Sequence, residues 1–360
     1  MVRGWKSHEL PMPTDALATL PPLLLINFSL HGFAVSDSGL SYVERAVPRV
    51  AENRSDQAWC EAHVPAIFAA YCGLAGIDEG KLVSYIDAMV PLGIGSSDEM
   101  TVPTVGALDR CIGSSYAERL KLWVAPELYK IADNPRRSAV AGVKLFLDGA
   151  IGARSAAIQG PWKGAGAAMF TYSDGALLEL LEEIGTWNTG IAMHAIGELA
   201  IEQALNTLEK AIAAGARFSP IRLEHVQFID REQAAKARQL GAILSMQPNF
   251  SSDSRDYSDR LPESYLRRNN PFRMLIDEVG FVPGRDLMFG SDGMPDGIAY
   301  AATVSLFPAF PAQYLSLDEL VAGYGPARGV SGTVTLEIDE ETAGVSVIAT
   351  DVDGQLRRIR

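Results

Sequence analysis

Short apolar runs that alternate with helical segments are the feature of this sequence that most constrains its fold. The runs are apolar at successive positions rather than at every second one, which is typical of strands buried on both faces of a sheet. Between them, residues 198–214 carry apolar side chains at i, i+4, i+7 and i+11 counted from Ile201, which predicts an amphipathic helix that ends before Gly215. This alternation predicts an α/β fold with a parallel sheet. The predicted strands are Leu23–Leu30, Gly93–Ser97, Leu120–Ala125, Val143–Leu147, Gly190–His194, Ile221–His225, Ala242–Met246 and Asp286–Phe289.

Polar residues stand at or just after the carboxyl ends of most predicted strands. Ligands bind at that edge both in (β/α)8 barrels and in doubly wound open sheets. An open sheet usually carries a Gly-rich phosphate-binding turn, but neither GxGxxG nor GxxxxGK[ST] occurs in the 360 residues. We therefore expect a (β/α)8 TIM-like barrel. The polar residues are Asp98, Glu127, Lys144, Asp148, His194, His225, Gln247 and Asp292.

The pattern changes after Gly325-Pro326. Residues 332–338 (GTVTLEI) and 345–350 are short, alternating and rich in β-branched side chains, which predicts antiparallel strands. We expect residues 1–325 to form the barrel and residues 326–360 to form a small β appendage, a partial β-sandwich.

Composition limits the partners and the compartment. Lys and Arg number 31 against 44 Asp and Glu, and the net charge of −13 argues against a nucleic-acid groove or an anionic membrane surface. No apolar run reaches the ~18 residues of a membrane span. The three cysteines have no CxxC spacing, which favours a reducing compartment. We expect a cytoplasmic protein with a small-molecule substrate, and homo-oligomerisation stays open.

Four of the strand-end residues form a chemically coherent set: Lys144, His194, His225 and Asp292. Two imidazoles and a carboxylate on one rim suit a borderline divalent metal such as Zn²⁺. Such an ion lowers the pKa of bound water toward ~7 and polarises a carbonyl group. Asp292 could both bind the ion and accept the proton of the attacking water.

Six segments, in order along the chain, resemble the amidohydrolase superfamily, and specifically its amidohydrolase 3 or YtcJ-like branch. Each motif is moderately specific, and their common order makes the resemblance strong. The segments are SLHGFAVSDSGL (29–40), VKLFLDGAIGARSAA (143–157), MHAIGELA (193–200), RLEHVQ (222–227), GAILSMQP (241–248) and FGSDGMP (289–295).

The resemblance implies a (β/α)8 barrel that hydrolyses C–N bonds of non-peptide or cyclic amides, or occasionally C–O bonds, with one or two metal ions. Carried over by position, Lys144 matches the fourth-strand lysine, which in many members is carboxylated and bridges two metals. His194 and His225 match the fifth- and sixth-strand histidine ligands. Asp292 matches the eighth-strand aspartate, which is a ligand and the general base.

The resemblance also suggests substrate contacts. His31 and Arg154 lie in segments that line the substrate cleft in relatives, and Asp148 follows Lys144 closely enough to orient it. After HAIG the family commonly has Asp then Arg. Here the two positions hold Glu198, which keeps a carboxylate, and Leu199, which removes an arginine contact.

One family feature is missing. Relatives have a first strand that ends in HxH and completes the metal site, whereas no HxH occurs here. Roughly the first hundred residues of the family pattern are unmatched, so we expect a barrel that lacks its first strand. Such a barrel would have unpaired edges, and its C-terminal appendage would lack the N-terminal strands that pair with it.

The candidate site residues can also be explained by structural roles alone. A strand-end histidine can serve the fold alone, Lys144 can pair with Asp148, and Asp292 can cap a helix. Three functions follow: a metal-dependent hydrolase with a reduced site, a catalytically impaired fragment or small-ligand-binding scaffold, and a piece of a longer product or assembly whose missing strand comes from elsewhere. We take the first as the working hypothesis.

Overall fold

The computed structural model describes residues 2–5, 14–27, 32–45, 47–75, 78–164 and 166–359. Its strands are β1 (Val2–Trp5), β2 (Leu24–Asn27), β3 (Phe33–Val35), β4 (Ser97–Val102), β5 (Leu120–Val124), β6 (Val140–Phe146), β7 (Gly190–Ala195), β8 (Ile221–His225), β9 (Ile243–Met246), β10 (Leu287–Phe289), β11 (Gly332–Asp339), β12 (Gly344–Val352) and β13 (Gln355–Arg358).

Helices connect most of these strands. The α-helices are α1 (Thr14–Thr19), α2 (Asp37–Val43), α3 (Val50–Asn53), α4 (Gln57–Ala75), α5 (Glu79–Met89), α6 (Val105–Gly113), α7 (Pro126–Ile131), α8 (Asn134–Ala139), α9 (Asp174–Gly185), α10 (Glu198–Ala213), α11 (Arg231–Gln239), α12 (Asp253–Asp256), α13 (Glu263–Arg268), α14 (Ile298–Leu306) and α15 (Leu317–Tyr324). Shorter helical turns are η1 (Val90–Leu92), η2 (Ala117–Arg119), η3 (Pro248–Ser252), η4 (Met274–Val279) and η5 (Pro311–Gln313).

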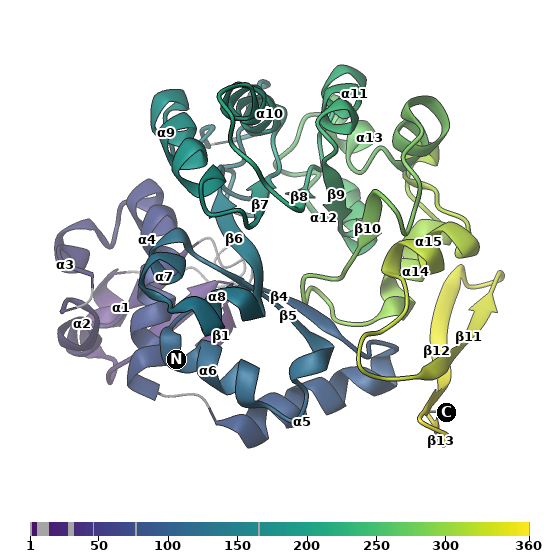
Figure 1. The fold of residues 1–360 in the computed structure, drawn as a ribbon, viewed down its shortest axis with the longest axis horizontal. Coiled ribbons are helices and arrows are strands. Elements are labelled where there is room, and N and C mark those ends of the chain that lie inside the picture. Colours follow the sequence, from purple (N-terminus) through teal and green to yellow (C-terminus); the bar gives the residue numbers. More distant parts are fainter. Residues whose placement is uncertain are drawn as a thin grey trace.

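The central sheet contains seven parallel strands, and the order across it is the order along the chain, from β4 to β10. The sheet curls into a half-barrel with helices on its outer side (Figure 1). The predicted α/β fold with a parallel sheet is therefore confirmed. Within the described residues the sheet has two edges, β4 and β10, so an eighth strand that would close a barrel is not among them.

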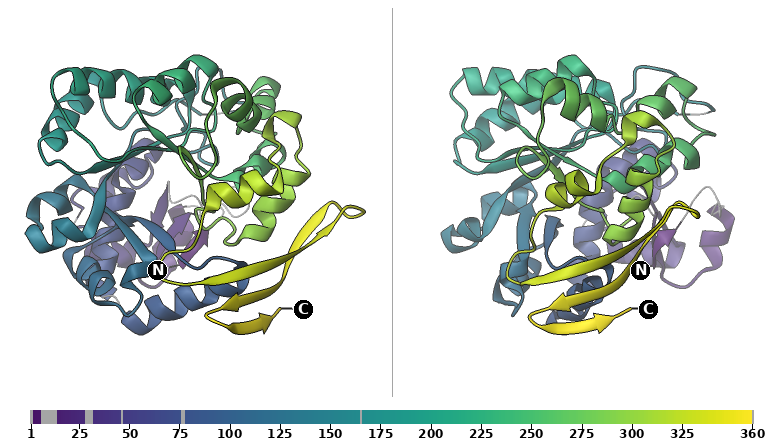
Figure 2. Two further views of the ribbon diagram at one scale, coloured as in Figure 1. Left: turned by 45° about the vertical axis from the view of Figure 1, so that its right-hand side comes forward. Right: turned by 90° about the vertical axis from the view of Figure 1, so that its right-hand side faces the viewer.

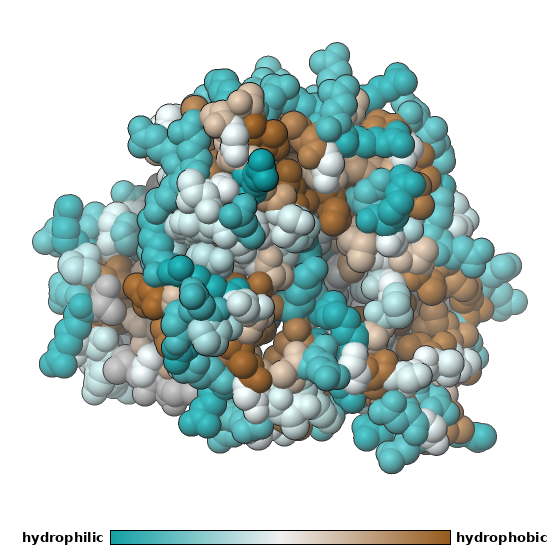
Figure 3. All heavy atoms as spheres, viewed as in Figure 1, coloured by the Kyte–Doolittle hydropathy of each residue, from teal (hydrophilic) through white to brown (hydrophobic). Residues whose placement is uncertain are grey.

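The middle strands are buried on both faces, which explains their continuous apolar runs. Every residue of β7 and β8 is buried, and the outer helices α9, α10 and α11 pack apolar side chains such as Leu181 and Leu205 over the sheet. Asp230 caps α11 through a reciprocal capping box with Gln233. On the face drawn in Figure 3, hydrophilic residues dominate the outline, and apolar residues gather near the upper middle and toward the right of the view.

One predicted strand is misplaced. Gly93–Ser97 was the predicted range, but β4 begins at Ser97 and runs to Val102. Ile94 is the one large apolar residue of the predicted range, and Gly93, which follows the helical turn η1, has a left-handed conformation (φ 85°). Asp98 therefore lies near the beginning of its strand and not at the carboxyl end.

Residues before β4 form a separate cluster. The strands β1, β2 and β3 make a small sheet, and α4 packs against it through Val64 and Ile67. The strand predicted at Leu23–Leu30 is confirmed for β2, and residues 28–30 lie outside the described residues.

The C-terminal antiparallel sheet is confirmed. It has the order β11-β12-β13 and extends along one side of the molecule (Figure 2). Its middle strand contacts α14, where the Val345 amide donates to Thr303 Oγ1 at 2.9 Å and Val347 joins the main core. The predicted domain boundary at residue 325 stays a prediction.

Among the described residues, no helix has both the length and the apolar character needed to cross a membrane.

We predict that Leu223→Ala lowers the free energy of unfolding by about 2–5 kcal/mol, because it leaves a cavity in the main core where Leu223 is 0% exposed. Urea denaturation monitored by circular dichroism measures the change. Ile131→Ala is the matched control, since that side chain is 73% exposed, and its effect should stay within about 0.5 kcal/mol. Equal effects of the two substitutions would contradict the placement of β8 at the centre of the core.

Candidate functional site

Three neighbouring strands bring the predicted ligand residues together. Lys144 lies in β6, His194 in β7 and His225 at the end of β8. The registers pair Phe146 with His194 and Ala195 with His225, so the two histidines are one step apart along adjacent strands. Their ring centroids are 4.5 Å apart, and one ring presents its edge to the other.

Oxygen acceptors orient both imidazoles. His194 Nε2 lies 3.1 Å from the carbonyl oxygen of Gly149 and 3.3 Å from Oδ1 of Asp148. His225 Nδ1 lies 2.7 Å from Oε1 of Gln247. One ring nitrogen of each histidine therefore faces an oxygen atom. This arrangement, in which the second nitrogen is hydrogen-bonded, is the one that metal-binding histidines show in general.

The backbone turns sharply where β8 ends. His225 and Val226 both have positive φ angles, 72° and 41°. A β-branched residue such as Val226 rarely adopts this conformation, and backbone strain of this kind concentrates at functional sites. The Val226 amide is held by the carbonyl oxygen of Ala195 at 3.0 Å, which fixes the turn next to β7.

Aromatic rings flank the histidine pair. Phe146 lies 5.5 Å from the ring of His194, and Phe250 stacks on His225 with centroids 6.0 Å apart and planes 7° apart. These rings exclude water from two sides of the pair and hold the imidazoles in place.

Lys144 is buried in the interior beside these rings. Burial lowers the pKa of Lys144 to about 8, an effect that the carboxylates of Glu224 and Asp292 oppose and the Arg222 guanidinium reinforces. Its Nζ lies 5.1 Å from the centre of the Phe146 ring.

Asp148 does not pair with Lys144, which corrects that prediction. Its two oxygens accept hydrogen bonds from the backbone amides of Ala157 (2.9 Å), Ile196 (3.0 Å) and Gly197 (2.8 Å). The carboxylate is buried, so it acts as an anchor that ties the loop after β6 to the loop after β7 and also contacts His194.

Asp292 follows β10 in a tight turn and has a positive φ of 53°. It is exposed, and its charge acts on Lys144. Within the described residues, no three His, Cys, Asp or Glu side chains lie close enough to hold a metal ion. The structure brings His194 and His225 together, and a metal-binding role of Asp292 stays a prediction.

Two of the predicted substrate contacts, Arg154 and Glu198, lie in the loop after β6 and at the start of α10. Arg154 makes an ion pair with Asp259 at 3.3 Å. Glu198 is buried, accepts a hydrogen bond from the Tyr265 hydroxyl and lies 3.3 Å from Arg268, while its Oε2 has no hydrogen-bond partner. His31 lies outside the described residues. Arg154 and Glu198 thus join the loop after β6 and the start of α10 to the α12–α13 segment.

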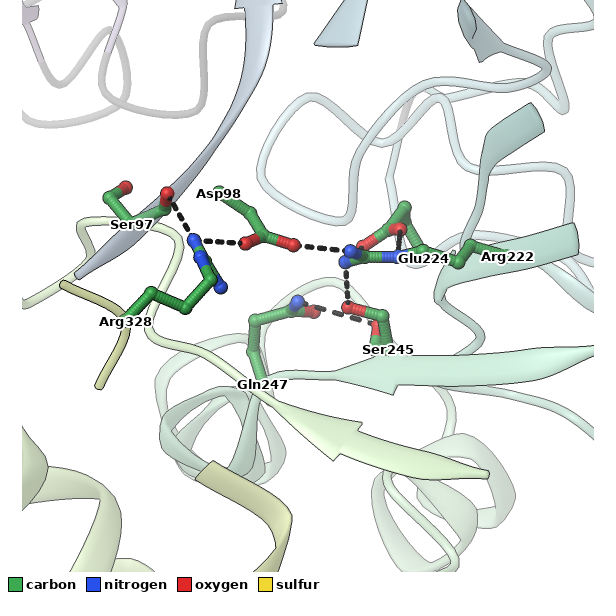
Figure 4. A network of polar contacts seen from close by, with 7 residues as sticks. All are labelled: Ser97, Asp98, Arg222, Glu224, Ser245, Gln247 and Arg328. Atoms are coloured by element: carbon green, nitrogen blue, oxygen red, sulfur yellow. Dashed lines mark hydrogen bonds and ion pairs between the residues drawn. The ribbon is translucent and has the colours of Figure 1, made fainter. Parts of the chain in front are cut away.

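An interior network of charges was not predicted. Arg222 of β8 donates to Glu224, to Ser245 of β9 (2.8 Å) and to Asp98 of β4, and Asp98 also pairs with Arg328 at 2.8 Å (Figure 4). Arg222 and Glu224 alternate inside an apolar run, which is the sequence signal that both point into the barrel interior.

We predict that Asp148→Ala lowers the free energy of unfolding by several kcal/mol, because each buried amide left without an acceptor costs about 1–3 kcal/mol. Asp148→Asn keeps one oxygen acceptor and should lose less. Asp230→Ala, which removes a surface helix cap, serves as the control and should cost about 1 kcal/mol. Thermal and urea unfolding compare the three variants, and an Asp148→Ala loss no larger than that of Asp230→Ala would contradict the anchoring role.

Comparisons with known proteins agree with this geometry. The family model described as "Amidohydrolase family" matches residues 78–303. The curated protein "Putative amidohydrolase YtcJ" of Bacillus subtilis is 28% identical over 246 residues, which is 67% of this chain and 44% of that protein, so the matched region spans less than half of the relative.

Two solved structures share the fold. An uncharacterized metal-dependent hydrolase from Pyrococcus horikoshii has a TM-score of 0.62 and 21% identity over 89% of this chain and 68% of its own. The corresponding protein from Pyrococcus furiosus has a TM-score of 0.58 and 20% identity over 88% and 70%. The sequence-based resemblance is confirmed, and because the family model covers well over half of its residues, this chain belongs to the amidohydrolase family.

Proposed function

We propose that this chain is a metal-dependent hydrolase that cleaves C–N bonds of small non-peptide amides or cyclic amides. The observation that carries the proposal is the oriented histidine pair at the carboxyl ends of β7 and β8. Both rings are buried, lie with their centroids 4.5 Å apart, and have an oxygen acceptor beside one ring nitrogen each. Membership in the amidohydrolase family supports the same chemistry.

The donor set fits a divalent metal in part. Two neutral imidazoles are ligands that Zn²⁺ accepts well, which makes zinc the first choice. His194 and His225 would hold the ion, and a carboxylated Lys144 would add an oxygen ligand from β6. A bound divalent ion supplies a Lewis acid for the substrate carbonyl and an acidified water. The described residues supply no group of three His, Cys, Asp or Glu ligands, so water or a further segment would complete the coordination.

The chain's own residues account for the rest of the proposed chemistry. Asp148 and Gln247 orient the imidazoles, and Phe146 and Phe250 exclude water beside them. The exposed Asp292 carboxylate takes the proton of the attacking water and returns it to the leaving nitrogen. Arg154 and, from the family resemblance, His31 are the proposed substrate contacts.

We propose that a further strand closes the half-barrel when the protein is functional. A (β/α)8 barrel places a further strand between β4 and β10, which are the two edges of the half-barrel in the described residues. A strand at that position would bring its carboxyl end beside Asp292 and could supply the ligands that the histidine pair lacks.

A second candidate function is a small-ligand-binding scaffold without catalysis. The absence of a three-residue ligand group from the described part of the chain favours it. The two candidates differ in metal content and in turnover, which the following experiments measure.

We predict that protein expressed with added Zn²⁺, Mn²⁺ or Co²⁺ retains about one ion per chain after dialysis, as measured by elemental analysis. His194→Ala and His225→Ala should each remove most of it, because each deletes a ligand. His63→Ala is the matched control, since His63 stacks on Trp59 in α4, away from the histidine pair, and should leave the content unchanged. Less than about 0.2 ion per wild-type chain would count against the proposal and favour the scaffold.

We predict that hydrolysis of a panel of N-acyl and cyclic amides falls about 10²–10⁴-fold in kcat/KM for Asp292→Asn, because the general base is lost. Metal content should be preserved. Asp318→Asn, at the start of α15, is the control and should keep full activity. Hydrolysis that survives Asp292→Asn would remove Asp292 from the mechanism, and a metal-loaded protein with no turnover on any amide would contradict the substrate class.

A further inference from the structure

We infer that Gln247 is the residue that positions His225, holding the proton on Nδ1 and the lone pair on Nε2. The inference concerns an intrinsic property of the folded chain, and its consequence for metal affinity rests on the proposed function. Nothing in the sequence motifs assigns this role, since Gln247 enters them only as a polar residue after β9.

The contact between the side chains of Gln247 and His225 is short and shielded from solvent. Gln247 Oε1 lies 2.7 Å from His225 Nδ1, and the two residues are only 5% and 8% exposed. Bulk water therefore competes little for either atom. A glutamine amide accepts only through its carbonyl oxygen, so this contact requires a proton on Nδ1.

The opposite orientation of the amide is disfavoured by what lies on its other side. Gln247 Nε2 points toward the backbone carbonyl oxygen of Ser245 at 3.5 Å (Figure 4). A flipped amide would turn its own oxygen toward that carbonyl and lose the donor there. One orientation satisfies both neighbours, and it is the one that presents Oε1 to His225.

The backbone beneath the amide is also fixed. Asn270 Nδ2 donates to the Gln247 carbonyl oxygen at 2.9 Å, and the Ser245 hydroxyl accepts from Arg222 Nη2 at 2.8 Å. The interior charge network thus reaches β9 directly below Gln247. These two contacts fix the backbone from which the Gln247 side chain extends toward His225.

Two neighbouring rings add to the restraint on His225. Phe250 covers one face of the ring, and His194 meets the ring at 68°. With Nδ1 committed to Gln247, the ring can offer only Nε2 as a ligand. Gln247 therefore decides which atom of His225 is available for metal binding, although it does not itself touch the metal.

The test reads the tautomer directly in the metal-free protein. With only five histidines in the chain, ¹⁵N NMR of histidine-labelled protein above pH 8 gives assignable ring nitrogens, with single substitutions as assignment aids. The variants are Gln247→Met, which keeps the length and removes the acceptor, and Gln247→Glu, which keeps an acceptor oxygen. Gln203→Met is the matched control, because Gln203 is a buried amide of α10 that donates to Tyr172 and Asp174 and to no histidine.

The expected result is a His225 ring protonated at Nδ1 in the wild type, in Gln247→Glu and in Gln203→Met. In Gln247→Met the proton should move to Nε2 in a large fraction of molecules. Zn²⁺ affinity, measured by competition with a chelating dye, should fall about 10- to 100-fold in Gln247→Met and recover in Gln247→Glu.

A wild-type His225 protonated at Nε2 would overturn the inference, even if Gln247→Met failed to fold. So would an unchanged tautomer and Zn²⁺ affinity in a folded Gln247→Met variant. A wild type with the expected tautomer but no Zn²⁺ binding would leave the positioning role standing and contradict the proposed function instead.

Discussion

The buried charge of Arg222 has to be balanced by polar partners, and this requirement organises the interior of the half-barrel. An unpaired guanidinium at the position of Arg222 would cost several kcal/mol, so the fold has to bring it partners. Glu224 faces it from the same strand, Ser245 from the next strand and Asp98 from the edge strand β4. The network thereby links strands that are four positions apart in the sheet. Barrel interiors are usually filled by branched apolar side chains, whereas here a polar cross-link spans part of the interior.

The same network connects the segment before the C-terminal sheet with the candidate functional site. Arg328, which precedes the C-terminal sheet, pairs with Asp98 and with the carbonyl oxygen of Ser97 at 2.7 Å. At the other end, Ser245 stands below the residue that contacts His225. The segment that leads into the C-terminal sheet and the candidate site are therefore joined by a continuous set of polar contacts through the core.

The fold was predictable from sequence where burial and hydrophobic pattern coincide. The strand β8 matches its predicted range, because Ile221 and Leu223 follow Pro220 and all five residues of the strand are buried. The strand β4 was misplaced because its sequence, SDEMTV, has only Val102 buried, so the apolar signal lay outside it. The small sheet before residue 36 was largely missed, since strands of three or four residues give no clear period.

The candidate site was predictable in its ligand types but not in its contacts. Parallel strands put His194 and His225 at one edge, and that follows from the strand ends alone. The role of Asp148 does not, because its backbone donors are nine, 48 and 49 residues away and depend on how two loops meet. The same holds for Gln247 and Arg222, whose partners are set by the register between strands.

The strands of the central sheet lie in the same order as in the chain, and this affects how well the sheet tolerates changes at its edges. Each strand forms its hydrogen bonds only with the strands before and after it in the chain, so a change at one edge does not require any other strand to find a new partner. β7 is the middle strand and β8 is next to it. The histidine pair therefore lies on the part of the sheet that is least affected when a strand is gained or lost at either edge. Such an architecture can vary at its edge strands while the central strands keep their pairing.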